Sequence, residues 1–347
     1  MGYPRGYPFF EQRSKKMIIP NNYKSDLSIK ETNEAIKYIK DLFEATLSRA
    51  LNLTRVSAPM FVYPESGLND NLSGSERPVN FSVPAVDGRV EVVHSLAKWK
   101  RQALKQYAFN PGEGLYTDMN AIRRDDVLDN THSIYVDQWD WEKIITPAER
   151  SINTLIEIVS LIYNAFKHVE ELVCKKYAWA PTLPENITFV TTRELVKAYP
   201  NLSPDEREKA ICKAHGAVFL MQIGDKIGKE PSHGDRAPDY DDWSLNGDII
   251  FYYPLLDCAF EVSSMGVRVD AKTLREQTKK AGCEERLALP FHQAILNKEL
   301  PLTVGGGIGQ SRICMFLLNK AHIGEVQAAI WSKEMEDTCA EAGIHLL

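Results

Sequence analysis

The chain has 347 residues, of which 44% are hydrophobic and 25% charged, a composition typical of a globular protein with a sizeable core. Its formal net charge of −6 argues against a broad nucleic-acid-binding surface, because neutralising phosphates requires an excess of basic residues. No apolar run reaches the ~18 residues of a membrane-spanning helix, so we expect no contact with a membrane interior. The six cysteines lack metal-site spacing, which predicts free thiols in a reducing cytoplasm.

The first 27 residues contain proline, glycine and basic residues but no apolar segment of the kind found in signal peptides. We interpret residues 1–27 as a flexible N-terminal extension. Residues 28–347 contain no internal repeat and no low-complexity linker. They are therefore predicted to form one domain.

The first predicted element is a long helix. Ser28-Ile-Lys-Glu31 is a capping box, and apolar residues then recur at helical spacing as far as Leu51. A strand over 53–59 follows and is ended by Pro59. Further along, a helix begins within 94–100, and strands are expected over 79–83, 90–93, 114–123 and 132–142. The last two strands and the charged loop between them predict a long antiparallel hairpin.

The second half mixes helices and strands without a regular βαβ alternation. Thr146-Pro-Ala-Glu149 is a second capping box and predicts the start of a long helix, while Ser203-Pro-Asp-Glu206 caps a helix that ends at Gly216. Strands are expected over 187–190, 217–222, 248–253, 259–264 and 326–331. These strand pairs favour an α+β fold in which helices flank one antiparallel sheet.

The segment Val304-Gly-Gly-Gly-Ile-Gly-Gln-Ser-Arg312 is the most informative part of the chain. Its four glycines would allow positive φ angles and leave no Cβ atoms to block a ligand. The spacing matches neither a Walker loop nor the Gly-x-Gly-x-x-Gly fingerprint. Arg312 follows three residues after the last glycine, where a guanidinium can stack on a planar ring. The segment therefore predicts a glycine-floored slot for a planar ring.

Three other features have both a chemical and a plain structural interpretation. Arg123 ends a strand and can bind a phosphate, or it can be a solvated hairpin arginine. Asp248 and Glu261 are expected near matched ends of two paired strands, where they can hold Mg²⁺ or simply be exposed acids. Gln138 and Asp140 share one face of a strand, and that face can point toward a ligand or lie at a sheet edge.

Together these features resemble the class II aminoacyl-tRNA synthetases. The helix, strand and Pro59 resemble motif 1, the hairpin with Arg123 resembles motif 2, and Gly307-x-Gly309-x-x-Arg312 with its helix resembles motif 3. Within that superfamily, residues 30–347 are similar to the ammonia-dependent aspartate–ammonia ligases of the asparagine synthetase A family. The segments that carry this similarity are 70–74, 93–101, 135–141, 236–243, 245–248, 260–266 and 305–312.

The resemblance implies a seven- or eight-stranded antiparallel sheet and a homodimer formed through motif 1. It also implies an enzyme that uses ATP and Mg²⁺ to join ammonia to L-aspartate. In this reaction a β-aspartyl-adenylate forms with release of pyrophosphate, and ammonia then displaces AMP to give L-asparagine. No glutaminase nucleophile is recognisable in the sequence, so ammonia is the expected nitrogen donor.

The resemblance also implies which residues form the site. Arg123 would hold the α-phosphate, Arg312 would stack on adenine, and Asp248 with Glu261 would place Mg²⁺. The implied ATP site comprises Arg123, Ser133, Val136, Asp248, Glu261, Gly307, Gly309 and Arg312. The implied aspartate and ammonia site comprises Asp70, Ser95, Lys100, Gln138, Asp140, Asp241, Ser263 and Ser264. Arg123, Asp70 and Gln138 are the candidate catalytic residues, and the hypothesis for Asp70 is that it takes a proton from ammonium.

Two other functions fit parts of this pattern. An aspartyl-tRNA synthetase would share the motifs, but few residues precede the core for an anticodon-binding domain and the net charge is −6. A synthetase-like binding module without activity would be expected to have lost Arg123, Asp248, Glu261 or Arg312. All four are present, which favours the ligase.

Overall fold

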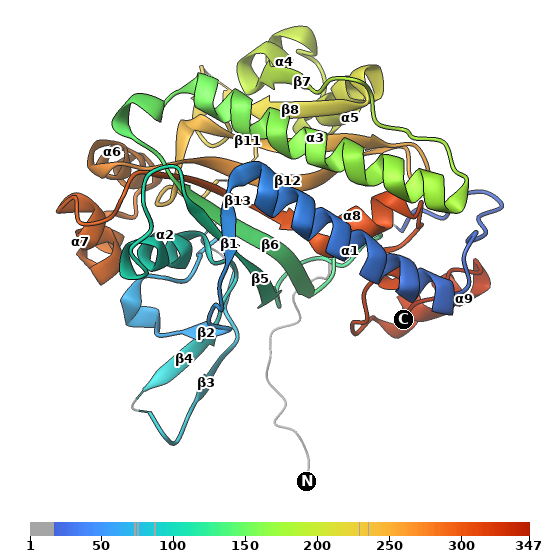
Figure 1. The fold of residues 1–347 in the computed structure, drawn as a ribbon, viewed down its shortest axis with the longest axis horizontal. Helices are drawn as coiled ribbons and strands as arrows, with labels where there is room; N and C mark the ends of the chain where they lie inside the picture. Colours follow the sequence, from blue (N-terminus) through green and yellow to red (C-terminus); the bar gives the residue numbers. More distant parts are fainter. Residues whose placement is uncertain (1–16, 73, 75, 87, 229, 235) are drawn as a thin grey trace.

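The computed structural model of the chain describes residues 17–347 apart from 73, 75, 87, 229 and 235. Its centre is an eight-stranded sheet with the order β1-β5-β6-β13-β12-β11-β8-β7 (Figure 1). The two edge pairs, β1–β5 and β7–β8, are parallel, and all other neighbours are antiparallel. The strands of this sheet are β1 Leu53–Arg55, β5 Gly114–Ile122, β6 Tyr135–Ile144, β7 Thr188–Thr191, β8 Ala217–Met221, β11 Asp241–Tyr253, β12 Cys258–Arg268 and β13 Thr303–Gly309.

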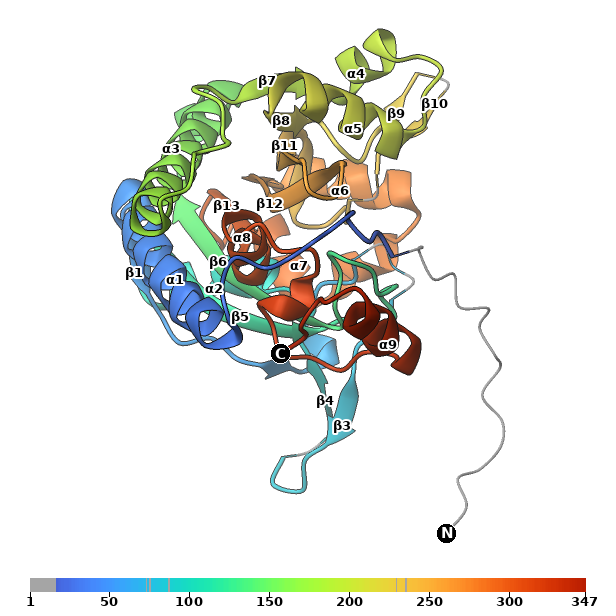
Figure 2. The same ribbon diagram turned by 90° about the vertical axis from the view of Figure 1, so that its right-hand side faces the viewer.

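Helices flank this sheet, and two small sheets complete the fold. The three-stranded small sheet projects from the body in Figures 1 and 2 and contains β2 Phe61–Val62, β3 Asn80–Ser82 and β4 Arg89–Val92. The two-stranded sheet pairs β9 Lys226–Ile227 with β10 Glu230–Ser232. The helices are α1 Ile29–Leu51, α2 Ala97–Gln106, α3 Ile152–Tyr177, α4 Thr192–Ala198, α5 Pro204–His215, α6 Ala271–Ala281, α7 Pro290–Leu296, α8 Gln310–Leu317 and α9 Lys333–Glu341. The α+β class predicted from the sequence is confirmed, with a mostly antiparallel sheet. No helix in the described part of the chain is long and apolar enough to cross a bilayer.

The main core lies between the sheet and the helices α1 and α3, which run side by side in both views (Figures 1 and 2). Phe43 of α1 stacks on Trp139 of β6 and also contacts Phe166 of α3. Because side chains alternate along a strand, Trp139 and Trp141 face this core while Gln138 and Asp140 face the opposite side. One face of the sheet is therefore apolar, and the other is free to build a polar site.

Local signals in the sequence predicted several element boundaries correctly. The capping box at Ser28 begins α1, and Ser203 begins α5, which ends before Gly216 at a φ of 78°. The capping box at Thr146, however, begins only a 3₁₀ turn over Pro147–Glu149, and Ser151 caps the long helix α3. The predicted start of the long helix is therefore wrong by five residues, because α3 is capped by Ser151 and not by Thr146.

The predicted strand over 326–331 is wrong. These residues have no regular secondary structure and lie between a 3₁₀ turn over Ile323–Glu325 and α9. Val326 and Trp331 are buried, but Trp331 packs edge-on against the ring of His322 instead of pairing in a ladder. Val326 and Trp331 are apolar residues that are buried here, although the backbone between them is irregular. The sequence pattern of buried apolar residues was therefore mistaken for that of a strand.

The predicted N-terminal extension is described only from residue 17 onward. In this part, the backbone of Ile18 exchanges two hydrogen bonds with the side chain of Asn130, at 2.7 and 2.8 Å. Tyr23 donates to Glu325, and Ser25 accepts from Lys320. Residues 18–25 thus pack against the body of the protein, and the division at residue 27 stays a prediction.

Candidate functional site

The glycine-rich segment forms strand β13, which lies between β6 and β12 in the sheet. None of its glycines has a positive φ, so the expectation of left-handed backbone is wrong. Instead, glycine is required by close approach: a Cβ at Gly307 would lie 2.5 Å from Oε1 of Gln138 and 2.8 Å from Oδ1 of Asp140. The absence of a side chain lets these two polar groups lie over the strand.

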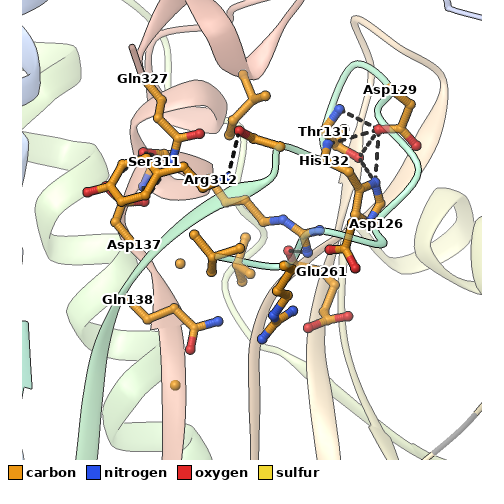
Figure 3. A pocket seen from close by; sticks show the side chains of 18 of the residues that line it. Asp126, Asp129, Thr131, His132, Asp137, Gln138, Glu261, Ser311, Arg312 and Gln327 are labelled. Atoms are coloured by element: carbon orange, nitrogen blue, oxygen red, sulfur yellow. Dashed lines mark hydrogen bonds and ion pairs between the residues drawn. The ribbon is translucent and has the colours of Figure 1, made fainter. Parts of the chain in front are cut away.

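A first cavity of about 370 Å³ opens beside the end of β13 (Figure 3). Arg312, on the first turn of α8, extends across this cavity and donates to the backbone oxygen of Glu261 at 2.8 Å. Arg123, directly after β5, lies on the cavity wall, and its buried Nε atom has no hydrogen-bond partner among the residues that the structure describes. Predicted ATP-site residues on its wall are Arg123, Ser133, Val136, Glu261, Gly307, Gly309 and Arg312.

A second cavity of about 340 Å³ adjoins the first. Arg123, Asp126, Gln138, Glu261 and Gly307 line both. The predicted aspartate and ammonia residues on the wall of the second cavity are Asp70, Ser95, Lys100, Gln138, Asp140, Asp241 and Ser264. Ser263 lies instead on the wall of the first cavity, where its hydroxyl donates to the backbone oxygen of Gly307 at 3.0 Å.

Lys100 and Asp140 place opposite charges at the floor of the second cavity. Lys100 Nζ lies 3.3 Å from Asp140 Oδ2 and donates to the backbone oxygen of Gly306 at 2.8 Å. Burial lowers the pKa of Lys100, although the carboxylate of Asp140 opposes this effect. Asp140 Oδ1 is buried without a hydrogen-bond partner in the described part of the chain. A buried polar atom with no partner is a candidate ligand contact.

Asp70 lies in the irregular segment after β2 and is 3% exposed. Its Oδ2 atom accepts a hydrogen bond from the hydroxyl of Ser95 at 2.7 Å, and its Oδ1 atom accepts one from the backbone N–H of Leu72 at 2.8 Å. Two donors fix the direction of the carboxylate. Asp70 therefore presents an oriented, buried carboxylate to the second cavity.

The three carboxylates of the acidic segment 236–243 are each paired with a basic side chain. Asp239 pairs with Lys98, Asp241 with Arg268, and Asp242 with Arg150. Arg268 also donates to both oxygens of Glu142 through its Nε and Nη2 atoms. Burial alone would raise the pKa of Glu142, but the guanidinium of Arg268 outweighs this effect, and the pKa lies below its usual value. Asp241 is thus one member of a buried charge network.

Asp248 and Glu261 are not in matched positions on β11 and β12. A register shift after Ile249 places Asp248 opposite Ser264, and Glu261 opposite Ile250. Glu261 lines both cavities, whereas Asp248 lines neither and accepts from Arg236 Nη2 at 2.5 Å. Burial raises the pKa of Asp248 to about 7, and the nearby carboxylate of Glu261 adds to the increase while Arg236 opposes it.

The donor chemistry of this carboxylate pair fits a magnesium ion. Mg²⁺ usually takes one or two protein carboxylates and completes its shell with water and phosphate oxygens. The described residues contain no cluster of three or more His, Cys, Asp or Glu side chains that would form a complete protein cage for a metal. Asp248 and Glu261 would therefore hold Mg²⁺ only together with a phosphate ligand, where the ion would neutralise phosphate charge.

Several charged or polar residues on the cavity walls were not selected from the sequence, among them Asp126, Arg236, Tyr240 and Arg268. Asp126 lines both cavities, and burial raises its pKa. Arg236, Tyr240 and Arg268 line the second cavity. Arg236 and Tyr240 belong to a segment that the sequence did mark, but only contacts between distant segments show which of its side chains face the cavity. Arg268 lies two residues after another marked segment, 260–266, and carries no local signal of its own.

Solved structures show which fold class this architecture belongs to. The asparaginyl-tRNA synthetase of Entamoeba histolytica in complex with asparaginyl-adenylate superposes with a TM-score of 0.60 at 12% identity, covering 88% of this chain and 72% of that one. The aspartyl-tRNA synthetase of the same organism gives 0.57 at 14% identity, covering 85% and 58%. The fold is therefore that of the class II aminoacyl-tRNA synthetase catalytic core.

Sequence comparison then identifies the family. The profile of the aspartate–ammonia ligase family matches residues 30–343. The chain is 61% identical to the aspartate–ammonia ligase of Ruminiclostridium cellulolyticum, over 95% of this chain and 99% of that protein. It is 60% identical to the enzyme of Clostridium perfringens strain SM101, over 96% and 100%. The chain belongs to the aspartate–ammonia ligase family, whose enzymes form asparagine from aspartate and ammonia with the use of ATP.

Proposed function

We propose that the two adjoining cavities divide the substrates of this ligase, with ATP in the first and L-aspartate and ammonia in the second. The observation that carries this proposal is their shared wall of Arg123, Gln138, Glu261 and Gly307. A carboxylate in the second cavity would meet the α-phosphate of a nucleotide in the first at this wall. Such contact is what formation of an acyl-adenylate requires.

In the first step, the β-carboxylate of aspartate attacks the α-phosphorus of ATP, and the bond to pyrophosphate breaks. Arg123 holds the α-phosphate and stabilises its developing negative charge. Arg312 stacks on adenine beside Gly309, and Ser133 and Val136 contact the nucleotide. Bound Mg²⁺, held by Asp248 and Glu261, would supply charge neutralisation at the phosphates. No covalent protein nucleophile is needed, because positioning and cationic stabilisation account for this chemistry.

The second cavity holds the amino acid. Lys100 binds a carboxylate of aspartate, and Asp140 and Asp241 bind its ammonium group or the incoming ammonium. Ser95, Gln138, Ser263 and Ser264 complete the polar surroundings. In the second step, Asp70 takes one proton from bound ammonium, the resulting ammonia attacks the acyl carbon and displaces AMP, and the nitrogen releases a second proton to solvent as the amide forms. The buried, doubly hydrogen-bonded carboxylate of Asp70 supports this role.

We further propose a homodimer assembled through α1 and β1, and a cytoplasmic location. The first follows from the resemblance of these elements to motif 1. The second is supported by the six cysteines, all of which are free thiols. Membership of the aspartate–ammonia ligase family supports this function over that of an aspartyl-tRNA synthetase or of a binding module without activity.

The experiment that tests the mechanism follows the products of one reaction mixture. The protein is incubated with ATP, Mg²⁺, L-aspartate and either ammonium or glutamine, and asparagine, AMP, ADP and pyrophosphate are measured. We expect asparagine with equal amounts of AMP and pyrophosphate from ammonium, and little product from glutamine. Formation of ADP in place of AMP would contradict the adenylate mechanism.

A further inference from the structure

Asp239 and Lys98 form an ion pair that lies outside both cavities. Lys98 Nζ donates to Asp239 Oδ2 at 2.7 Å, and the two side chains are 2% and 0% exposed. Burial would raise the pKa of Asp239, but the charge of Lys98 and a hydrogen bond from His292 hold it far below its usual value. The carboxylate of Asp239 is therefore ionised in the interior, with the amine of Lys98 as its hydrogen-bond donor.

The same carboxylate oxygen also binds the neighbouring helix α7. His292, which is fully buried, places Nε2 at 2.9 Å from Asp239 Oδ2. Lys98 belongs to α2, and Asp239 precedes β11 by two residues. One buried carboxylate thus joins three segments that are distant in the sequence. We call Asp239, Lys98 and His292 the Asp239 clamp.

The clamp extends to the segment that carries Asp70. Lys98 Nζ makes a second hydrogen bond, at 3.0 Å, to the backbone oxygen of Asn69. The side chain of Asn69 accepts from the backbone N–H groups of Asp70 and His94, both at 2.9 Å. His94 Nδ1 lies 3.0 Å from the backbone oxygen of Asp70. Lys98 thus holds the backbone of Asn69, and Asn69 and His94 in turn hold the backbone N–H and the backbone oxygen of Asp70.

This arrangement is not explained by stability alone. A buried ion pair contributes little to folding on average, since desolvation offsets the attraction between the charges. What a buried ion pair does provide is a fixed geometry, because charge-assisted hydrogen bonds hold both partners in one orientation. The segment after β2 has no regular secondary structure at residues 68–71, and Leu72 adopts a φ of 47°. Such a segment needs contacts from outside to hold a carboxylate in place.

We propose that the Asp239 clamp positions Asp70 for the step in which ammonia is used. Asp239, Lys98 and His292 are positioning residues, because they line neither cavity and act through Asn69. This inference rests on the proposed role of Asp70 in taking a proton from ammonium. Loss of the clamp should therefore impair the ammonia step more than formation of the adenylate.

The test uses the double variant Lys98→Met/Asp239→Asn, which removes both buried charges together. The matched control is Arg150→Met/Asp242→Asn, which removes another largely buried pair that does not contact Asn69. Aspartate-dependent exchange of pyrophosphate into ATP reports the first step, and asparagine formation at varied ammonium reports the second. Hydroxylamine, which is largely uncharged at neutral pH, reports capture of the adenylate by a nucleophile that needs no prior deprotonation.

We expect the clamp variant to keep pyrophosphate exchange within about threefold of wild type and to lose about tenfold or more in kcat/KM for ammonium. Hydroxamate formation should stay near the wild-type rate, and the control variant should show no such difference between the two steps. An equal loss in both steps, or no loss in the ammonia step, would overturn the proposal. If the double variant does not fold, His292→Gln, which keeps a donor at the position of Nε2, should show the same difference at smaller size.

The variant Asp70→Asn separates failure of this inference from failure of the proposed function. If Asp70→Asn leaves the ammonia step unchanged, the proposed role of Asp70 is wrong, and the clamp proposal, which depends on that role, is wrong as well. If Asp70→Asn impairs the ammonia step and the clamp variants do not, only the clamp proposal is wrong.

Discussion

Lys100 and Asp140 form a buried ion pair at the floor of the second cavity, with Nζ and Oδ2 3.3 Å apart and neither side chain more than 2% exposed. Lys100 also donates to Gly306, so its ammonium is fixed between α2 and β13. Within the described ranges, the other oxygen of Asp140 has no hydrogen-bond partner. A substrate that carries both an ammonium and a carboxylate can satisfy both members, and an α-amino acid is such a substrate.

Replacing Lys100 with methionine should weaken binding of aspartate. Loss of one charge-assisted hydrogen bond to a substrate carboxylate costs about 1.5–3 kcal/mol, which corresponds to an increase of about 10- to 100-fold in KM for aspartate. KM for ATP should change by less than about threefold. Both constants are measured by pyrophosphate exchange. Lys105→Met, on the exposed side of the same helix, is the control, and a parallel increase in both constants would contradict the assignment.

The carboxylate of Glu261 should contribute to binding of Mg²⁺. Glu261→Gln removes one of only two proposed protein ligands, and we expect the Mg²⁺ concentration for half-maximal activity to rise about tenfold or more. A second readout is independent of catalysis: Mg²⁺ should stabilise the wild-type protein against heat in the presence of a non-hydrolysable ATP analogue, and should do so much less for the variant. Glu284→Gln, at an exposed position, should behave as wild type. If the variant keeps the wild-type Mg²⁺ dependence in both assays, Glu261 is not a ligand.

His322 should make the protein less stable in mild acid. Burial lowers its pKa from 6.5 to about 4, although Asp129 opposes the shift, and its ring packs against Trp331. Because the unfolded chain binds this proton at higher pH than the folded chain, the contribution of His322 is complete above pH 6.5 and is lost as the pH falls toward 4. The difference is on the order of 3 kcal/mol in the free energy of unfolding.

The variant His322→Asn tests this linkage. Asparagine does not titrate, and its side-chain oxygen can replace Nδ1 of His322, which accepts from the backbone N–H of Gly324 at 3.0 Å. The variant should be less stable at pH 7, because the contact with Trp331 is lost, but its free energy of unfolding should fall less steeply between pH 6.5 and 4.5. Denaturant unfolding at fixed protein concentration measures both slopes. Identical slopes for the two proteins would refute the prediction.

Local patterns in the sequence predicted the parts of the fold that depend on neighbouring residues. The capping boxes at Ser28 and Ser203 and the glycine after α5 act within one or two helical turns, so their signals are readable. The shared face of Gln138 and Asp140 followed from the two-residue period of a strand. Resemblance to a family then supplied the set of residues that these patterns alone could not connect.

Features that depend on distant segments were not predictable in this way. The register shift after Ile249 moves Asp248 away from the position expected relative to Glu261, and no residue type in β11 or β12 marks it. The basic partners of the acidic segment lie far from it in the sequence. The separations are 141 residues for Lys98, 92 for Arg150 and 27 for Arg268. Whether a carboxylate is free or paired is decided by such contacts.

Gly305 and Gly307 lie on the same face of β13 and should respond differently to replacement by alanine. At Gly307, a Cβ would meet the ends of the side chains of Gln138 and Asp140, both of which line the second cavity. At Gly305, it would overlap the carboxylate of Glu142, which is held by Arg268 and Thr303 in a fully buried network. The first clash displaces polar groups of the second cavity, and the second disrupts a buried ion pair.

We therefore expect Gly307→Ala to fold with a melting temperature near that of wild type and to raise KM for aspartate about tenfold or more. Gly305→Ala should lose about 3–5 kcal/mol of stability, because breaking a buried pair leaves an uncompensated charge. Thermal unfolding and pyrophosphate exchange on the same two preparations measure these effects. Gly282→Ala is not a suitable control, since its φ of 67° is itself unfavourable for alanine. Glycine at 307 would be structural rather than functional if Gly307→Ala unfolded as readily as Gly305→Ala while binding aspartate normally.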